Sequence, residues 1–182
     1  MARLAAMKYQ KIVLLGYMGC GKSTVGKLLA QNLQIPFYDL DQLIEEEIGG
    51  PISTYFQKQG ELKFRALEHQ LFEKTLAQPQ AMVLALGGGT PCYYDHMDTL
   101  SRTPGLLSIY LQLPLGTLTD RLFKERAHRP LIADIAQYSQ LLEFVGKHLF
   151  ERTPYYKKAT LELALGEASP EAVVQKILAE LA

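Results

Sequence analysis

Residues 12–30, IVLLGYMGCGKSTVGKLLA, decide the fold of this chain. The apolar run from Ile12 to Leu15 is typical of a buried parallel strand, and the apolar residues after Ser23 recur at helical spacing. Between them, residues 16–23 match the phosphate-binding pattern G-x-x-x-x-G-K-[ST] in full. Because strand, loop and helix follow in the order that this loop requires, the stretch predicts an α/β protein that binds a nucleoside triphosphate.

The residue types in the loop suit a chain of phosphates. Glycines let the backbone curl with its N–H groups pointing inward, and the following helix directs the positive end of its dipole at the anion. Lys22 would place its charge near the β- and γ-phosphates, and Ser23 would offer its hydroxyl to Mg²⁺. The expected nucleotide-binding residues of this stretch are Gly19, Cys20, Gly21, Lys22, Ser23 and Thr24. A chance glycine-rich turn is the alternative, and the loop alone does not identify the acceptor, since kinases, GTPases and motor ATPases share it.

The composition is that of an ordinary globular domain. Of the 182 residues, 48% are hydrophobic and 21% are charged, and 19 basic residues balance 19 acidic ones. The length predicts one domain, with its core over about residues 9–182. The zero net charge argues against general binding of nucleic acid or membranes. Cys20 and Cys92 have no partners at metal-ligand spacing, so neither a zinc site nor a disulfide framework is indicated.

No segment has the apolar length of a signal peptide or a membrane span, so we expect a cytoplasmic protein. Residues 1–8 are expected to form an extension outside the core, and Met7 leaves the start of the chain open. A monomer is the default expectation.

Five short apolar runs alternate with helical patterns along the chain. The predicted strands are 12–15, 35–39, 81–86, 106–111 and 160–165. The predicted helices are the one after the loop, 42–48, 53–76 with an interruption at Gly60, 95–101, 116–123, 137–158 across Pro154, and 170–181. This alternation predicts a parallel sheet covered by helices on both faces.

Two carboxylates, Asp39 and Asp41, follow the second predicted strand. Ligands of open α/β sheets bind at the carboxyl ends of the strands, so we expect both side chains in one crevice with the phosphate loop. One could then reach Mg²⁺ and the other a substrate hydroxyl. The third strand ends without an acid, which leaves metal binding to Ser23 and the Asp39 region. In the alternative interpretation, Asp41 only caps the helix at 42–48.

Two further segments could serve a phosphate acceptor. The buried stripe of the helix at 61–76 is predicted to consist of Leu62, Ala66, Leu67 and Leu71. Arg65 and Glu68 would lie on a neighbouring face, where an exposed ion pair without a function is the alternative. Gly87–Gly89 would let backbone N–H groups approach a ligand closely, and a flexible turn is the alternative there.

Residues 121–131, RLFKERAHRPL, form a basic segment. Its charges include Arg121, Lys124, Arg126 and Arg129, and Pro130 prevents one uninterrupted helix. In a protein with a phosphate loop, such a segment is typical of a lid whose arginine closes on the phosphates. A merely solvated surface is the alternative.

Several separate motifs together resemble the shikimate kinase family. They are GYMGCGKSTVGKLLA (16–30), FYDLDQLIE (37–45), FRALE (64–68), LGGGTP (86–91), HRPL (128–131) and ERTPYY (151–156). The resemblance runs from Lys11 to the C-terminal helix. It implies the fold of nucleoside monophosphate kinases, with sheet order 2-3-1-4-5. It also implies an ATP-dependent enzyme that transfers the γ-phosphate to the 3-hydroxyl of shikimate in aromatic amino acid biosynthesis.

Position by position, the resemblance implies a role for each site residue. Catalytic roles fall to Lys22, Asp41 and Arg129, and Mg²⁺ to Ser23 and, through water, Asp39. Shikimate would be bound by Asp41, Arg65, Arg152 and the backbone N–H groups of Gly87, Gly88 and Gly89. Arg121, Arg129 and Pro170 would join the loop in binding ATP. A helical excursion over about 42–77 would hold shikimate, and a lid over about 123–136 would close.

The chemistry of these substrates suits the residue types. Guanidinium groups bind a carboxylate in bidentate fashion, and an aspartate accepts from a hydroxyl. Phosphoryl transfer then needs mainly alignment and charge neutralisation, so Asp41 is expected to orient the hydroxyl first and accept its proton second. Two alternatives stay open: another small-metabolite kinase, such as a gluconate kinase, and a non-catalytic nucleotide-binding domain.

Overall fold

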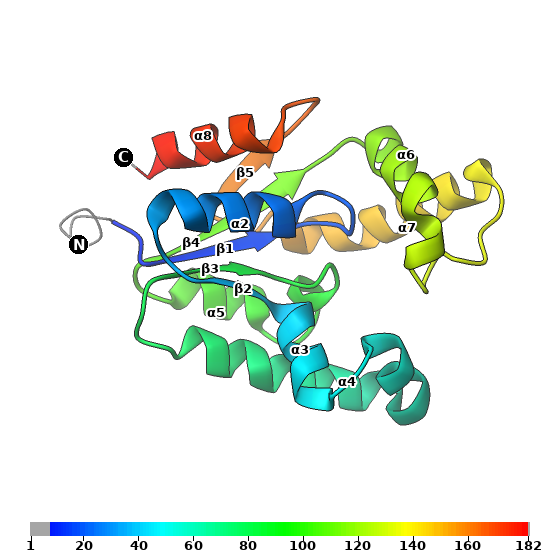
Figure 1. Cartoon of the computed structure of the whole chain (residues 1–182), viewed down its shortest axis with the longest axis horizontal. Coiled ribbons are helices and arrows are strands. Elements are labelled where there is room, and N and C mark those ends of the chain that lie inside the picture. The colour runs from blue at the N-terminus through cyan, green and yellow to red at the C-terminus, as the bar shows by residue number, and fades with distance from the viewer. Residues whose placement is uncertain (1–7, 182) are drawn as a thin grey trace.

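The computed structural model describes residues 8–181, apart from the side chain of His128. Five parallel strands form one sheet in the order β2-β3-β1-β4-β5 (Figure 1). The strands are β1 (Lys11–Leu15), β2 (Phe37–Asp39), β3 (Met82–Ala85), β4 (Leu106–Gln112) and β5 (Leu161–Ala164). The predicted fold class and strand order are therefore confirmed. Except for Lys8, the expected extension at residues 1–8 lies outside the described residues.

The place of each strand in the sheet explains its burial. β1 lies in the centre, between β3 and β4, and its residues Ile12–Leu15 are fully buried. A strand covered on both faces needs such a continuous apolar run. We expected the second strand to be buried as well, but all three residues of β2 are only half-buried. The reason is that β2 is an edge strand, with β3 as its one partner in the sheet.

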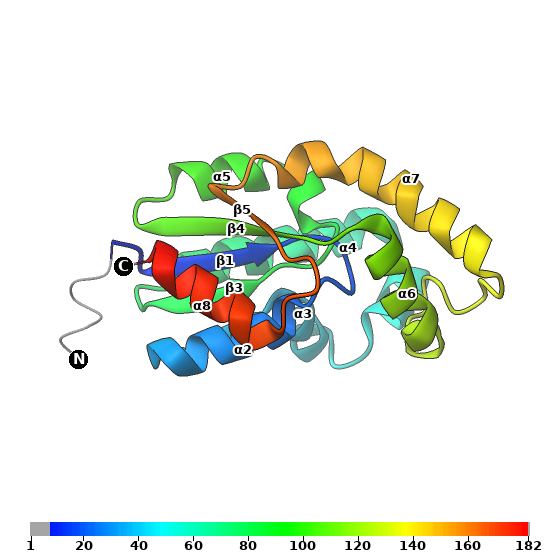
Figure 2. The same cartoon turned by 90° about the horizontal axis from the view of Figure 1, so that it is seen from above.

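Helices cover both faces of the sheet. They are α2 (Lys22–Leu33), α3 (Leu40–Ile48), α4 (Ile52–Leu76), α5 (His96–Arg102), α6 (Leu115–Glu125), α7 (Tyr138–Tyr156) and α8 (Pro170–Glu180), with 3₁₀ turns η1 (Thr90–Cys92) and η2 (Arg126–His128). α2 and α8 lie side by side on one face, while α5 and the second part of α4 lie on the other (Figures 1 and 2). The predicted helices on both faces are confirmed.

Helix α4 carries a break and a buried face that the sequence predicts only in part. The interruption expected at Gly60 is present, with φ 79° and ψ 171°. The buried residues beyond it recur at helical spacing and are Phe64, Glu68, Leu71, Phe72, Thr75 and Leu76. The predicted stripe is wrong at Ala66, which is exposed, and at Leu62, which is 87% exposed. Phe64 occupies the core-facing position instead. Leu62 and Ala66 each lie two residues from Phe64, which is about 200° around the helix axis, so both face the opposite side.

The carboxyl ends of the strands gather the remaining elements. Around this end of the sheet lie the loop before α2, then α3 with the start of α4, and α6 with η2 (Figure 1). This is the edge at which open α/β sheets bind ligands. In the part of the chain that the structure describes, none of the helices has the length and hydrophobicity needed to cross a membrane.

We predict that Gly26→Ala destabilises the fold. A Cβ at this position of α2 would overlap the ring of Phe37 on β2 and lie 3.3 Å from Leu14 Cδ1. Overpacking of this kind costs about 1–3 kcal/mol of the free energy of unfolding, which urea denaturation measures. Gly116→Ala in α6 is the control, because no atom lies within 4 Å of a Cβ there. Equal unfolding midpoints for the two variants would contradict the prediction.

Candidate active site

The phosphate loop curls between β1 and α2 as its sequence predicts. Gly16, Gly19 and Gly21 have φ angles of 140°, 79° and 98°. At Gly16, a Cβ would also lie 2.7 Å from the carbonyl oxygen of Leu111, so both the backbone angle and the space require glycine. Helix α2 begins at the next residue after Gly21, which turns its N-terminus toward the loop. The loop is therefore built to receive an anion.

Lys22 is already held inside this loop. Its Nζ donates hydrogen bonds to the carbonyl oxygens of Gly16 at 3.0 Å and Tyr17 at 3.1 Å. These acceptors are neutral, and a charged phosphate oxygen is the stronger acceptor for an ammonium group. The lysine is therefore positioned for an incoming phosphate.

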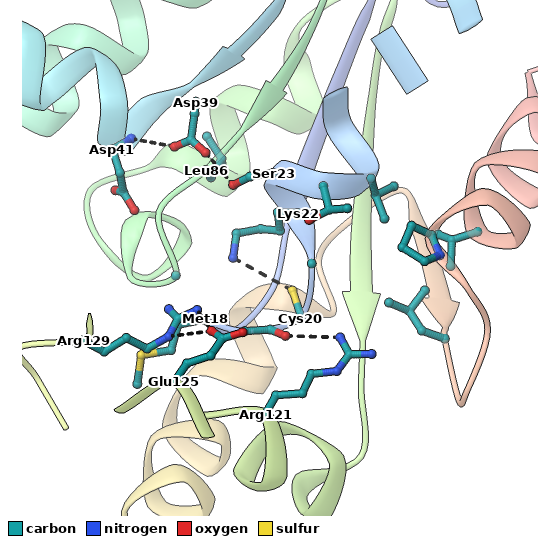
Figure 3. Close-up of a pocket in the computed structure, with 18 of the residues that line it drawn as sticks. Met18, Cys20, Lys22, Ser23, Asp39, Asp41, Leu86, Arg121, Glu125 and Arg129 are labelled. Carbon is teal, nitrogen blue, oxygen red and sulfur yellow. Dashed lines mark hydrogen bonds and ion pairs between the residues drawn. The ribbon is translucent and has the colours of Figure 1, made fainter. Parts of the chain in front are cut away.

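A cavity of about 510 Å³ opens in front of the loop (Figure 3). The predicted nucleotide-binding residues Gly19, Cys20, Gly21, Lys22, Ser23, Thr24, Arg121, Arg129 and Pro170 all line it. Asp39, Asp41 and Gly88 line it as well. In Figure 3 the two aspartates face the arginines across the cavity, with Lys22 between them. The structure thus brings the residues predicted for nucleotide and metal into one space.

Both aspartates line the cavity with the phosphate loop, as expected, but they make different contacts. Asp39 ends β2 and is the N-cap of α3: its Oδ1 accepts from the backbone N–H of Asp41 at 3.1 Å. Its other oxygen, Oδ2, accepts from the Ser23 hydroxyl at 2.6 Å. The interpretation of Asp41 as the helix cap is therefore wrong, because Asp39 caps the helix. The Asp41 carboxylate remains free to face the cavity (Figure 3).

The environment of Asp41 shifts its titration. The side chain touches solvent in the cavity, but the surrounding protein displaces much of the bulk water. This desolvation raises the pKa of Asp41 to about 6, the nearby carboxylate of Asp39 adds to the rise, and Lys22 opposes it. Perturbed carboxylates in a cleft are typical of functional sites.

Arg65 and Glu68 form a buried ion pair. Glu68 is only 1% exposed, and its Oε2 accepts from Arg65 Nη1 at 2.7 Å. The Arg65 guanidinium lies over the ring of Tyr93, with its Cζ 3.9 Å from the ring centroid. Arg65 Nε is buried and has no hydrogen-bond partner among the described residues. The carboxylate of Glu61 lies 3.6 Å from this Nε. The interpretation as an exposed surface pair is therefore wrong.

The triple glycine is needed for close packing. A Cβ on Gly87 would lie 2.6 Å from Asp41 Oδ1, and a Cβ on Gly89 would lie 3.0 Å from Arg65 Nη2. The carbonyl oxygen of Gly88 accepts from the Tyr156 hydroxyl at 2.5 Å. These glycines therefore let the loop pass between Asp41 and Arg65, which a merely flexible turn would not require.

Arg152 approaches the same region from α7. Its guanidinium lies over the ring of Tyr17, with its Cζ 5.6 Å from the ring centroid. Burial raises the pKa of the Cys92 thiol, and the charges of Arg152 and Arg65 both oppose that rise. The two predicted carboxylate-binding arginines therefore converge around Cys92. Neither of them lines the 510 Å³ cavity.

The basic segment ends α6 and continues into η2, so Pro130 follows the helical part as predicted. Arg129 donates to Glu125 Oε2 from Nε at 3.2 Å and from Nη2 at 2.6 Å. Arg121 Nη1 donates to the carbonyl oxygen of Gly19 at 3.3 Å. Both arginines line the cavity, so the basic segment is more than solvated surface.

Sequence reasoning missed several residues that hold the site in place. Thr90 donates to Glu68, Tyr156 donates to Gly88, and Glu125 binds Arg129. The four-residue spacing of Glu125 and Arg129 in the sequence could have indicated their pair. The other two contacts join segments far apart in the sequence, and no local pattern indicates them.

Comparisons with known proteins agree with this site. A family model described as shikimate kinase matches residues 18–182. A shikimate kinase of Flavobacterium johnsoniae is 43% identical over 173 residues, which cover 95% of this chain and 99% of that protein. The crystal structure of shikimate kinase from Bacteroides thetaiotaomicron has a TM-score of 0.83 at 31% identity and covers 97% of this chain and 99% of its own. Shikimate kinase from Acinetobacter baumannii in complex with shikimate has a TM-score of 0.82 at 31% identity, covering 96% and 93%. This chain belongs to the shikimate kinase family.

Proposed function

We propose that this chain transfers the γ-phosphate of ATP to the 3-hydroxyl of shikimate, which yields shikimate 3-phosphate and ADP for aromatic amino acid biosynthesis. The observation that carries the proposal is the position of Asp41. Asp41 lies between the phosphate loop, which carries Lys22, and the loop Gly87–Gly89, which packs against Arg65 at Gly89. One carboxylate can therefore meet both a nucleotide and an acceptor. The relative from Acinetobacter baumannii, which was crystallised with shikimate, supports the choice of acceptor.

The nucleotide would occupy the 510 Å³ cavity. Loop N–H groups and Lys22 would bind the β- and γ-phosphates, since the loop has the curled geometry for it. Arg121 and Pro170 both line the cavity, and Arg121 lies across it from the aspartates (Figure 3), which suits contact with the adenine. Bound there, ATP would direct its γ-phosphate toward Asp41.

The donor set at Ser23 and Asp39 fits Mg²⁺. A hydroxyl and a carboxylate oxygen, 2.6 Å apart, both belong to residues of the cavity wall. Mg²⁺ prefers oxygen ligands and usually takes one or two from the protein, with phosphates and water supplying the rest. We propose that Ser23 binds it directly and Asp39 through water. When bound, Mg²⁺ would neutralise part of the phosphate charge.

The acceptor would bind beside Asp41, on the side of the two arginines. Arg65 and Arg152 would hold the shikimate carboxylate, and backbone N–H groups of Gly87–Gly89 would assist. Glu68 holds Arg65 at Nη1 and Glu61 lies 3.6 Å from Nε, while no hydrogen bond among the described residues engages Nη2, so Arg65 can bind an anion through Nη2 without leaving Glu68. The excursion over about 42–77 would supply this half of the site.

Asp41 would orient the reacting hydroxyl. As a carboxylate it accepts a hydrogen bond from the hydroxyl, which fixes the oxygen in line with the γ-phosphate. In a loose transition state the proton leaves late, and a carboxylate with a pKa of about 6 can then receive it. The lid over about 123–136 would close over the nucleotide. Arg129 would then break its bonds to Glu125 and bind the γ-phosphate instead.

Further features of the proposal concern the whole chain. We propose one domain over residues 1–182 that acts as a cytoplasmic monomer, without a nucleic-acid or membrane partner. The balance of 19 basic and 19 acidic residues supports the absence of such partners.

The test of the function is a coupled assay of ADP release with MgATP. Shikimate, gluconate, a nucleoside monophosphate and no acceptor are compared. We expect turnover with shikimate alone. Turnover only with gluconate or a nucleotide would contradict the acceptor, and no turnover with any of them would favour a non-catalytic nucleotide-binding domain.

We predict that Arg65→Ala and Arg152→Ala each raise the KM for shikimate by about 10- to 150-fold and leave the KM for ATP nearly unchanged. Each variant loses a charge-assisted contact worth about 1.5–3 kcal/mol. Steady-state kinetics with each substrate varied in turn measures both constants. Lys63→Ala, which removes an exposed charge from α4, is the matched control. Equal losses for ATP and shikimate would refute the assignment of the arginines.

Asp41→Asn should lower kcat and at the same time stabilise the ligand-free protein at neutral pH. The pKa of about 6 in the folded state lies above the ordinary aspartate pKa of 3.8, so the folded state binds the proton more tightly than the unfolded state. The stability that comes from protonated Asp41 is therefore present below pH 4 and is lost as the pH rises through 6. Asn cannot ionise and avoids this loss.

Thermal unfolding of the wild type and Asp41→Asn at pH 4 and pH 8 measures the effect. The advantage of the variant should be largest at pH 8 and smallest at pH 4. An advantage that does not depend on pH would show that ionisation of Asp41 is not its cause, and wild-type turnover would remove Asp41 from the mechanism.

A further inference from the structure

A pair of histidines lies behind the acceptor side of the site. His96, the first residue of α5, is fully buried, and its ring packs on Phe72 of α4 with 4.3 Å between the ring centroids. His96 Nδ1 lies 2.7 Å from the carbonyl oxygen of Thr90, and its Nε2 lies 3.0 Å from His69 Nδ1. His69 in turn stacks on Tyr94 at 4.4 Å. Both nitrogens of His96 therefore have partners in the protein.

The partners determine where the protons lie. A carbonyl oxygen only accepts, so His96 Nδ1 must carry a proton and donate it to Thr90. In neutral His96, Nε2 is then an acceptor. It accepts a hydrogen bond from the N–H group that His69 carries at Nδ1. Burial lowers the pKa of His96, and His69 lowers it further. Glu68 and Glu73 on α4 and the bond to Thr90 oppose this shift, but the net pKa of His96 is lowered from its ordinary value, which favours the neutral ring.

Thr90 connects this pair to the substrate arginine. It follows Gly87–Gly89 directly and begins η1. His96 binds the carbonyl oxygen of Thr90, and the hydroxyl of Thr90 donates to Glu68 Oε1 at 2.6 Å. The other oxygen of Glu68 holds Arg65. One residue is thus held at both its backbone and its side chain, and the hydrogen bonds run without interruption from His69 to Arg65.

We propose that His96 is a positioning residue of the acceptor site, which holds Thr90 so that Glu68, Arg65 and the N–H groups of Gly87–Gly89 keep the geometry that binds the substrate carboxylate. This inference rests on the proposed function, in which Arg65 binds that carboxylate. It assigns to His96 no contact with either substrate. The donor that matters is Nδ1–H, which the Thr90 carbonyl oxygen requires, while the bond to His69 uses the other ring nitrogen.

The two amide variants of His96 separate these bonds. The amide nitrogen of Asn occupies about the place of Nδ1, and that of Gln about the place of Nε2. His96→Asn should therefore keep the bond to Thr90 and leave the shikimate KM within about twofold of wild type. His96→Gln should raise the shikimate KM about fivefold or more, since a hydrogen bond contributes about 1 kcal/mol. The KM for ATP should stay within about twofold in both.

Controls distinguish positioning from general damage. Ser108→Ala removes a buried hydrogen bond to Thr160 between β4 and the start of β5, and it should leave both KM values unchanged. Equal shikimate KM values for His96→Asn and His96→Gln, or an equal rise in the KM for ATP, would overturn the proposal. In the wild type, nitrogen NMR of the ring should find the Nδ1–H tautomer of His96, and the Nε2–H tautomer would equally overturn it.

Arg65→Ala in the same assay separates this proposal from the proposed function. If Arg65→Ala raises the shikimate KM but the two His96 variants do not differ, the role of His96 is refuted. The proposed acceptor site then still stands. An unchanged KM for Arg65→Ala refutes the acceptor site itself, and the role of His96 with it.

Discussion

The curled backbone at residues 16–21 is the constraint on which the rest of the structure depends. Three glycines with positive φ angles turn the chain directly from the central strand into α2. This turn points the N-terminus of the helix and the Lys22 ammonium at one space, and the carbonyl groups of Gly16 and Tyr17 hold that ammonium there. An anion bound there gains from the helix N-terminus, from the backbone N–H groups of the loop and from the Lys22 ammonium.

The acceptor half solves a different electrostatic problem. A guanidinium that is mostly buried needs a partner, and Glu68 supplies one without blocking every donor of Arg65. Glu68 is itself fully bonded, with Arg65 on one oxygen and the Thr90 hydroxyl on the other. Breaking such a pair would leave an uncompensated buried charge, so the arrangement fixes the direction of Arg65 firmly. A substrate carboxylate would then meet an arginine that needs little reordering.

The two halves meet at groups that belong to both. Gly88 lines the nucleotide cavity, and its carbonyl group is bound by Tyr156 of α7, the helix that carries Arg152. Tyr17 contributes a carbonyl group to Lys22 and presents its ring to Arg152. Because the same residues contact both halves, packed protein would set the distance between the nucleotide and the acceptor at the positions that we propose for them.

Local patterns in the sequence were sufficient for the fold class and for most of the residues that line the cavity, while the strand order followed from the resemblance to a family. The phosphate loop, the alternation of strands and helices, the break at Gly60 and the proline after η2 each depend on neighbouring residues. Only the tertiary structure decided that Asp39 caps α3 while Asp41 faces the cavity, since capping depends on where β2 ends. The burial of Glu68, the exposure of Leu62 and the meeting of Arg65 with Arg152 around Cys92 depend on the rotation of α4 and on the packing of η1 against α7. Contacts between segments that are distant in the sequence leave no local pattern, because they are determined by how whole elements pack.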